Sequence, residues 1–377
     1  MIMKINLAVF ILAAAFLSSV AGTGENEFTY KNSYDGSTRQ AACYIPDNLE
    51  GNKKYPLLVV AHYMSGDRFT ARRLGYNQEC EKRKWLLVCP ELHGKRQPGQ
   101  NSMAALEAQH DIIDAIDYMK KNYAVDDTRI YISGRSMGGM LTQIMMAKYP
   151  DLFAAGVAGE GISDLTTLKS IDAVTKAVKD ECGDPDKNSF EYRRRSSINY
   201  ASNFAYAPLI MWHGTNDIFV QPEQSETLYN EIKKYNRFQD QVNWLNAAAH
   251  CPANYTSGWV CDKLQYYANA GDVTRLRTFN KLKLVTDEDK KFFWLRLVPA
   301  ENDKFGQIDA DIDAGGILNL NCNNLSKVEV DLNLVSRLNN INACKVESNQ
   351  PLTVEIYRGS ALLCKDSGSN FTMAVTK

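Results

Sequence analysis

A single serine stands between glycines in the stretch Gly134-Arg135-Ser136-Met137-Gly138-Gly139. This stretch follows the apolar, β-branched run at 129–133 and precedes a segment that is compatible with a helix. A Gly-x-Ser-x-Gly turn between a strand and a helix lifts the serine hydroxyl off the edge of a sheet, and the glycines avoid clashes there. The N-terminal N–H groups of the helix then favour developing negative charge. This context predicts that Ser136 is a nucleophile and not an incidental serine in a glycine-rich turn.

A serine nucleophile needs a histidine as base and a carboxylate that orients the histidine. His213 lies inside an apolar strand, where a hydrogen-bonded core histidine is expected, whereas His250 ends a later strand and opens a loop. We therefore predict that His250 is the base. Asp217 and Asp164 each follow a predicted strand, so either carboxylate could orient the histidine. Asp217 is favoured, and Asp164 is the alternative.

Cleavage of an acyl bond also needs N–H donors for the oxyanion of the tetrahedral intermediate. One expected donor is the backbone N–H of Met137, directly after the nucleophile. The second should come from the loop after the apolar strand that ends near Ala61. The sequence there is His62-Tyr63-Met64, which leaves open whether Tyr63 or Met64 donates.

These residues belong to a region in which short apolar runs alternate with longer amphipathic segments. The runs at Tyr55–Tyr63, Trp85–Leu92 and Pro208–Gly214 have the pattern of buried strands. Between the second and third of these runs, the segment at 102–123 has apolar residues at helical spacing, such as Ile112 and Ile116. Alternating strands and helices predict an α/β fold with a mostly parallel sheet flanked by helices. We assign residues 22–271 to this predicted catalytic domain.

After Gly271 the pattern changes to period-two alternation. We predict a small C-terminal antiparallel β domain at 284–377, with the boundary within Ala268–Lys283. Its predicted strands are Lys291–Pro299, Ile317–Cys322, Lys327–Leu334 and Pro351–Gly359. The alternation places Val328, Val330 and Leu332 inward, and Glu329, Asp331 and Asn333 outward. Phe292, Phe293 and Trp294 are expected to pack in the core rather than bind polysaccharide.

The N-terminus predicts export. Lys4, the apolar run Leu7–Leu17 and small residues at 19–21 form the pattern of a signal peptide at 1–21. The apolar run is too short to cross a bilayer, which needs ~20 residues. The expected mature protein is therefore secreted, extracellular or periplasmic, and free of the membrane once the signal is removed.

The nine cysteines fit an oxidising compartment, so disulfide bonds are expected. Cys251–Cys261 and Cys322–Cys344 are candidate pairs because each pair is close in sequence. No C-x-x-C pair occurs and the chain has five histidines, so neither a zinc site nor another metal or cofactor is predicted. The 43 Lys and Arg residues nearly balance the 44 Asp and Glu residues, which gives no indication of a nucleic-acid partner.

The segments around Ser136 and Asp217 resemble the catalytic domain of prolyl oligopeptidase-like α/β-hydrolases. They are also similar to secreted carbohydrate esterases and polyester depolymerase-like esterases. The resemblance covers about 44–267 and implies that Ser136, Asp217 and His250 are nucleophile, acid and base. Peptidases of this type carry a large N-terminal β-propeller, for which this chain has too few residues before the first strands.

The expected function is therefore that of a secreted serine hydrolase, with a carboxylic ester on a small molecule or polymer as its substrate. A serine peptidase is the first alternative, since both reactions pass through an acyl-serine intermediate. A non-catalytic binding module on a hydrolase fold is the second alternative. The complete set of three residues in the order serine, acid, histidine argues against it.

Overall fold

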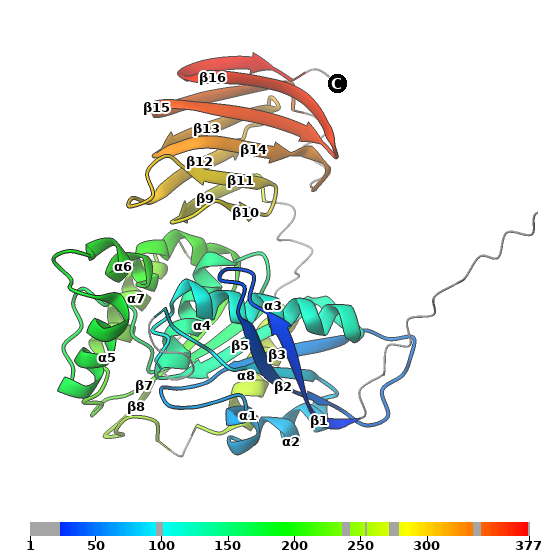
Figure 1. The fold of residues 1–377 in the computed structure, drawn as a ribbon. Helices are drawn as coiled ribbons and strands as arrows, with labels where there is room; N and C mark the ends of the chain where they lie inside the picture. Colours follow the sequence, from blue (N-terminus) through cyan, green and yellow to red (C-terminus); the bar gives the residue numbers. More distant parts are fainter. Residues whose placement is uncertain are drawn as a thin grey trace, which may run out of the picture.

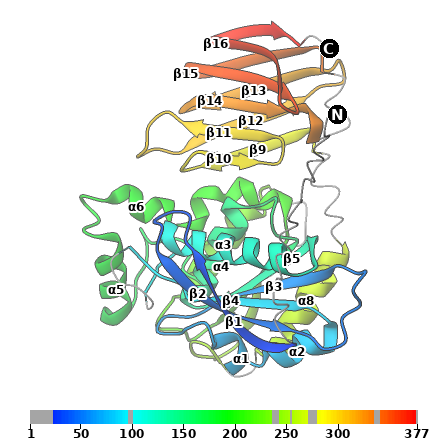
Figure 2. The same ribbon diagram turned by 45° about the vertical axis from the view of Figure 1, so that its right-hand side comes forward.

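The computed structural model describes residues 23–95, 101–235, 242–252, 255–270, 279–334 and 341–375. Two eight-stranded sheets form separate layers along the chain, and the second lies above the helices of the first (Figures 1 and 2). The predicted signal peptide at 1–21 and part of the predicted boundary at 268–283 fall outside the described residues. No described helix is both long enough and apolar enough to cross a membrane.

The first sheet has the strand order β1-β2-β4-β3-β5-β6-β7-β8. Strand β2 runs antiparallel to both of its neighbours, and the strands from β4 to β8 all run parallel. Their carboxyl ends therefore meet at one edge. The strands are β1 (Gly24–Lys31), β2 (Thr38–Ile45), β3 (Tyr55–Ala61), β4 (Leu86–Pro90), β5 (Val125–Arg135), β6 (Ala155–Gly159), β7 (Leu209–Gly214) and β8 (Val242–Leu245).

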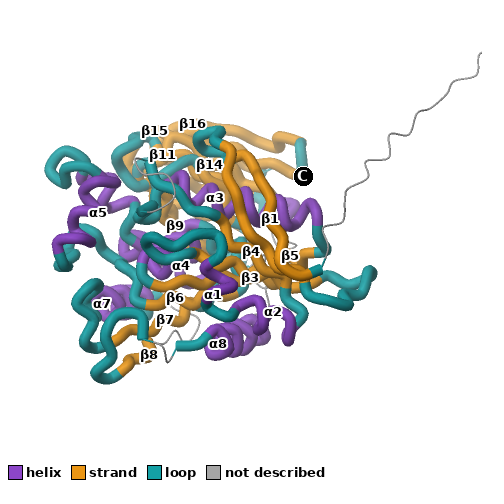
Figure 3. The backbone as a smooth tube through the Cα atoms, turned by 60° about the horizontal axis from the view of Figure 1, so that its bottom comes forward, coloured by secondary structure: helices purple, strands orange, loops and turns teal. Residues whose placement is uncertain are grey.

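Helices cover both faces of this sheet, so its central strands β3, β4, β6 and β7 are buried along almost their whole length (Figure 3). In β3, Leu57 and Val59 pack into one core with α3, α4 and α7, while Leu58 and Val60 pack into the other with α2 and α8. The helices are α1 (Thr70–Arg73), α2 (Tyr76–Arg83), α3 (Leu106–Asn122), α4 (Met137–Lys148), α5 (Asp172–Cys182), α6 (Ser189–Arg194), α7 (Glu223–Ile232) and α8 (Ser257–Ala270), with a 3-10 helix η1 (Ser197–Tyr206).

The second sheet is mostly antiparallel and forms a near-barrel around a core of its own. Its order is β10-β11-β14-β15-β13-β12-β9, and β16 pairs with β15. The strands are β9 (Lys281–Thr286), β10 (Lys290–Phe292), β11 (Leu295–Pro299), β12 (Gly306–Ile312), β13 (Ile317–Asn323), β14 (Leu325–Asp331), β15 (Ala343–Arg358) and β16 (Ala361–Ala374), with a short 3-10 helix η3 (Leu332–Leu334) after β14.

A fully antiparallel domain was the wrong expectation for this sheet. Strand β15 runs parallel to both β13 and β14, pairing with β13 through 343–348 and with β14 through 353–357. The two shorter strands therefore follow one another along one edge of β15, joined at Asn324 with a positive φ of 49°. Because β13 and β14 run in the same direction, the chain must return after β14 to the start of β13 before β15 can run parallel to both.

The predicted inward positions of this domain are confirmed. Val328, Val330 and Leu332 are fully buried, as are Phe292 and Trp294. The predicted strand Lys291–Pro299 is split, however, into the hairpin strands β10 and β11 around Phe293, which has a φ of 50°. Strand β9 begins at Lys281, three residues before the predicted start of the domain at 284.

The two sheets are joined by buried polar contacts. Lys148 at the end of α4 lies 2.8 Å from Asp287 after β9, and Arg194 of α6 lies 2.8 Å from the same carboxylate. Tyr206 of η1 is buried within the core of the second sheet. Packing and ion pairs thus connect the C-terminal sheet to the helices that cover the first sheet.

The nine cysteines all lie among the described residues and form no disulfide bond with one another, which corrects the expectation of disulfide bonds. Cys251 lines a cavity, whereas Cys261 is buried among α2 and α8. In the parallel pairing of β13 with β15, Cys322 lies opposite Ser348 and Cys344 lies opposite Leu318. That offset of four residues separates the two cysteines by roughly 13 Å along the strands, too far for a disulfide.

Candidate active site

Ser136 occupies a sharp turn between β5 and α4. Its φ of 57° and ψ of −125° are rare for a residue with a side chain, and its N–H donates to the carbonyl of Gly159 at 2.8 Å. A Cβ on Gly138 would lie 2.2 Å from the carbonyl oxygen of Ala61, and one on Gly139 would lie 2.2 Å from that of Gly159. Glycine at these positions lets α4 approach β3 and β6 closely enough to hold the turn.

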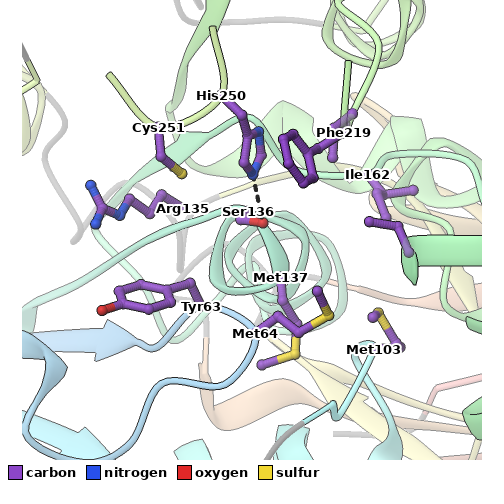
Figure 4. Close-up of a pocket in the computed structure, with 12 residues that line it drawn as sticks. Tyr63, Met64, Met103, Arg135, Ser136, Met137, Ile162, Phe219, His250 and Cys251 are labelled. Atoms are coloured by element: carbon purple, nitrogen blue, oxygen red, sulfur yellow. Dashed lines mark hydrogen bonds between the residues drawn. The ribbon is translucent and has the colours of Figure 1, made fainter. Parts of the chain in front are cut away.

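His250 connects the serine to an aspartate (Figure 4 shows its contact with Ser136). Its Nε2 lies 2.9 Å from Ser136 Oγ, and its Nδ1 lies 2.5 Å from Asp217 Oδ2. The three side chains come from the loops after β5, β7 and β8, at the carboxyl edge of the parallel strands. The structure therefore brings together the three residues that the sequence predicted as nucleophile, acid and base.

Asp217 is held in its charged form by its surroundings. Burial raises the pKa of this carboxyl, but donors from His213, His250 and the N–H of Val220 outweigh burial and bring the pKa well below its usual range. Oδ1 also accepts the N–H of Phe219 at 2.8 Å. His213 is fully buried and donates Nε2–H to the carbonyl of Val220, as expected for a core histidine.

Asp164, the alternative acid, is placed in a different role. Its carboxylate accepts the backbone N–H of Thr166 at 2.8 Å and the hydroxyl of the same residue at 2.6 Å. These bonds stabilise the turn after β6. The geometry therefore favours Asp217 as the partner of His250.

Glu160 was missed by the sequence analysis. It is fully buried after β6, has a φ of 48°, and its Oε2 lies 3.3 Å from His250 Nδ1. It accepts the N–H groups of Gly214 and Cys251, so it ties the ends of β6, β7 and the loop of His250 together. Burial raises its pKa, and the nearby Asp217 charge adds to that effect. A carboxylate between glycines at a strand end was the available signal.

The loop after β3 is fixed by a buried histidine. His62 Nε2 accepts the N–H of Leu92 at 3.0 Å, which leaves Nδ1–H to donate to the carbonyl of Tyr63 at 2.9 Å. Burial lowers the pKa of His62, so the neutral ring in this arrangement is favoured. Tyr63 and Met64 are thereby held beside Ser136 and Met137 at the wall of one cavity.

That cavity has a volume of about 320 Å³ and opens beside Ser136. Met64, Met103, Met137 and Ile162 form its apolar wall, while Phe219 stacks against the ring of His250 at 5.2 Å. Val174 of α5 also contributes, so the segment between β6 and β7 shapes the site.

Glu160, His250 and Cys251 are the group of described residues whose ligand atoms lie close enough for a metal ion, within 4.8 Å. Their atoms are already committed, because Glu160 accepts the N–H of Cys251 and His250 Nδ1 faces Asp217. Burial and the Glu160 charge raise the pKa of the Cys251 thiol to about 12, so it is protonated at neutral pH. The donor set fits a hydrogen-bonded arrangement better than a metal centre.

The strand order and the serine turn define an α/β-hydrolase fold. Residues 92–269 match the Prolyl oligopeptidase family (Peptidase_S9), so this part of the chain is similar to the α/β-hydrolase domain of that family. The resemblance found in the sequence is thus confirmed.

Among curated relatives, an acetylxylan esterase of Coprinopsis cinerea is 30% identical over 60% of this chain and 60% of its own length. Poly(3-hydroxyalkanoate) depolymerase C of Paucimonas lemoignei is 27% identical over 56% of this chain and 54% of its own. Feruloyl esterase B of Talaromyces stipitatus is 24% identical, with 54% and 57% covered. The chain thus spans little more than half the length of these relatives.

Solved structures show the same fold. An acylaminoacyl peptidase of Pyrococcus horikoshii superposes with a TM-score of 0.51 at 21% identity, covering 65% of this chain and 40% of its own. A puromycin-hydrolyzing peptidase of Mycobacterium tuberculosis gives a TM-score of 0.53 at 18% identity, with 64% and 40% covered. At this identity the likeness concerns the fold alone.

Proposed function

We propose that this protein is a serine hydrolase that cleaves carboxylic esters through an acyl-serine intermediate. The observation that carries the proposal is the continuous contact from Ser136 Oγ through His250 to Asp217 at the edge of a cavity. A serine hydroxyl needs such a base to become nucleophilic at neutral pH, and the base needs a carboxylate to select its tautomer.

In this mechanism Ser136 Oγ attacks the ester carbonyl while its proton moves to His250 Nε2. Asp217 accepts the Nδ1–H of His250 and stabilises the imidazolium that forms. The N–H of Met137 and one N–H of the Tyr63–Met64 segment donate hydrogen bonds to the oxyanion of the tetrahedral intermediate. His250 then protonates the leaving alkoxide, and a water activated by the same histidine hydrolyses the acyl-serine.

One observation supports an ester over a peptide bond. The curated relatives that share 24–30% identity are named as esterases or as a depolymerase. The peptidases share the fold at 18–21% identity, which carries no argument about substrate. The acyl group is small or polymer-borne in this proposal, because the cavity beside Ser136 is open at one side and limited in volume.

The test compares purified protein with Ser136→Ala on a short-chain aryl ester and on a matching aryl amide of a short peptide. We expect the wild type to cleave the ester and Ser136→Ala to have a kcat lower by about 10⁶-fold. The circular dichroism spectrum of the variant should match that of the wild type, which would show that the fold is kept. Cleavage of the amide by the wild type alone would support a peptidase instead. Equal rates for wild type and variant on both substrates would remove the catalytic proposal.

We also propose that the protein is exported, on the basis of the signal pattern at 1–21. The mature protein recovered from the producing organism should then begin near Gly22. Mass spectrometry of its N-terminal peptide tests this, and an intact N-terminus on the folded protein would contradict it.

A further inference from the structure

Among the described residues that line the cavity at Ser136, Arg135 carries the one permanent charge. It is the last residue of β5 and precedes the proposed nucleophile directly. Its guanidinium lies over the ring of Tyr63, with Cζ 5.0 Å from the ring centroid. This stacking orients the group and leaves its N–H donors directed outward in the plane of the guanidinium.

The charge of Arg135 is not neutralised within the described residues. No described carboxylate oxygen lies within 4.0 Å of it, and its buried Nε has no hydrogen-bond partner. Arg194 and Arg195 differ, since Arg194 contacts Asp287 and Arg195 contacts both Glu191 and Glu181. A half-buried guanidinium without an anion loses part of its hydration, a cost that the stacking on Tyr63 offsets in part and that a bound anion would reduce further.

The carboxylates of the site are engaged elsewhere. Asp217 accepts from His250 and two backbone N–H groups, and Glu160 accepts from Gly214 and Cys251. Both face the histidine. Within the described residues, no carboxylate of the site is left to pair with Arg135, so a carboxylate on the ligand can take that place.

The cavity wall is divided by Ser136. Arg135 and Tyr63 lie on one side of the serine, and Phe219, Ile162 and Met103 lie on the other (Figure 4). An ester bound across Ser136 would place one of its two parts against the apolar side and the other part beside the guanidinium.

We propose that the preferred substrate is an ester that carries a carboxylate close to the scissile bond, which Arg135 binds while the apolar side receives the rest. The inference rests on the proposed ester hydrolysis and adds the charge of the substrate. A planar guanidinium pairs with a carboxylate through two parallel hydrogen bonds, which fixes both its position and its orientation.

The experiment uses pairs of substrates that differ in charge alone. One pair has the charge on the alcohol side: 3-acetoxybenzoate and 3-acetoxybenzamide. The other pair has the charge on the acyl side. It consists of the mono-4-nitrophenyl ester of a short dicarboxylic acid, whose second carboxyl group is free, and the same ester with a carboxamide in place of that carboxyl group. Each rate is corrected for spontaneous hydrolysis, and the ratio of kcat/KM for the anionic and neutral members is measured.

We expect one pair to show a ratio well above 1 for the wild-type protein, falling by roughly 10- to 150-fold in Arg135→Met, the range for hydrogen bonds to charged groups. Arg135→Lys should retain part of the preference because it keeps the charge and loses the bidentate geometry. Arg129→Met is the control: Arg129 is on the same strand, exposed and paired with Asp126, so this variant should keep the wild-type ratio.

A ratio that is near 1 for both pairs, or that is unchanged in Arg135→Met, would overturn the inference. Absence of Ser136-dependent hydrolysis of every ester would instead refute the proposed function, so the two failures are distinguishable. A ratio that falls equally in Arg129→Met would show that net charge, and not Arg135, makes the difference.

Discussion

Replacing Asp217 by Asn tests how His250 is supported. An asparagine keeps the size of the side chain and removes the charge that faces the imidazolium. With charges about 4 Å apart and an effective dielectric constant of ~20, that interaction is worth ~4 kcal/mol. Since each ~1.36 kcal/mol corresponds to a factor of ten in rate, kcat should fall by about 10³-fold.

The structure also explains why the loss should not be larger. An asparagine amide can donate to Nδ1 and select the wrong tautomer, a change that costs about 10⁴-fold in serine proteases. Here Glu160 Oε2 lies 3.3 Å from the same nitrogen and can still accept the Nδ1–H. The double variant Asp217→Asn with Glu160→Gln removes this second acceptor and should lose a further factor of about ten or more.

The assay is steady-state hydrolysis of an aryl ester at neutral pH, with Asp164→Asn as the matched control. Asp164 stabilises the turn at Thr166, so its replacement should change kcat by less than about threefold. Equal losses for Asp164→Asn and Asp217→Asn would refute the assignment of the acid. A loss of less than tenfold for Asp217→Asn would refute the electrostatic reasoning.

Three further predictions concern stability and geometry. Asp287→Asn removes the buried anion that Lys148 and Arg194 share and leaves Lys148 only Glu288 and Arg194 only Glu191, so urea unfolding at pH 7 should show a loss of about 3 kcal/mol. Because the pKa of Asp287 is depressed, its contribution is present above the unfolded carboxyl pKa of ~3.9 and is lost as pH falls through the folded pKa; an equal loss in acid would contradict this. The pKa of Glu160 is raised in the folded protein, so the free energy of unfolding of the wild type should fall as pH rises above the unfolded value of about 4.3. Glu160→Gln lacks this titration and should therefore become more stable relative to wild type over the same range. A difference in stability that stays constant with pH would argue against it. Gly138→Ala should reduce kcat by about 10²-fold because its Cβ would lie 2.2 Å from the Ala61 oxygen and displace the serine turn, whereas Gly51→Ala, with open space around it, should retain wild-type kinetics.

Several features could be predicted from the sequence because they depend on local patterns. The alternation of apolar strands and amphipathic helices predicts the parallel sheet, and period-two alternation predicts the buried side of β14. The serine turn is readable because the close approach of α4 to β3 and β6 requires glycines beside the serine. The order of acid and histidine after Ser136 follows from which polar residues end strands.

Contacts between distant segments were decided by the tertiary structure. The pairing of His250 with Asp217 in preference to Asp164 depends on the adjacency of β7 and β8, which sequence spacing does not determine. Glu160 reaches His250 because β6 lies next to β7, and Arg135 lacks a counterion because of what surrounds it in space. The parallel pairing of β15 and the separation of the cysteines likewise depend on strand register. Local sequence sets the period and the turns, whereas partners across a sheet are chosen by the packing of the whole chain, in which many weak contacts act together.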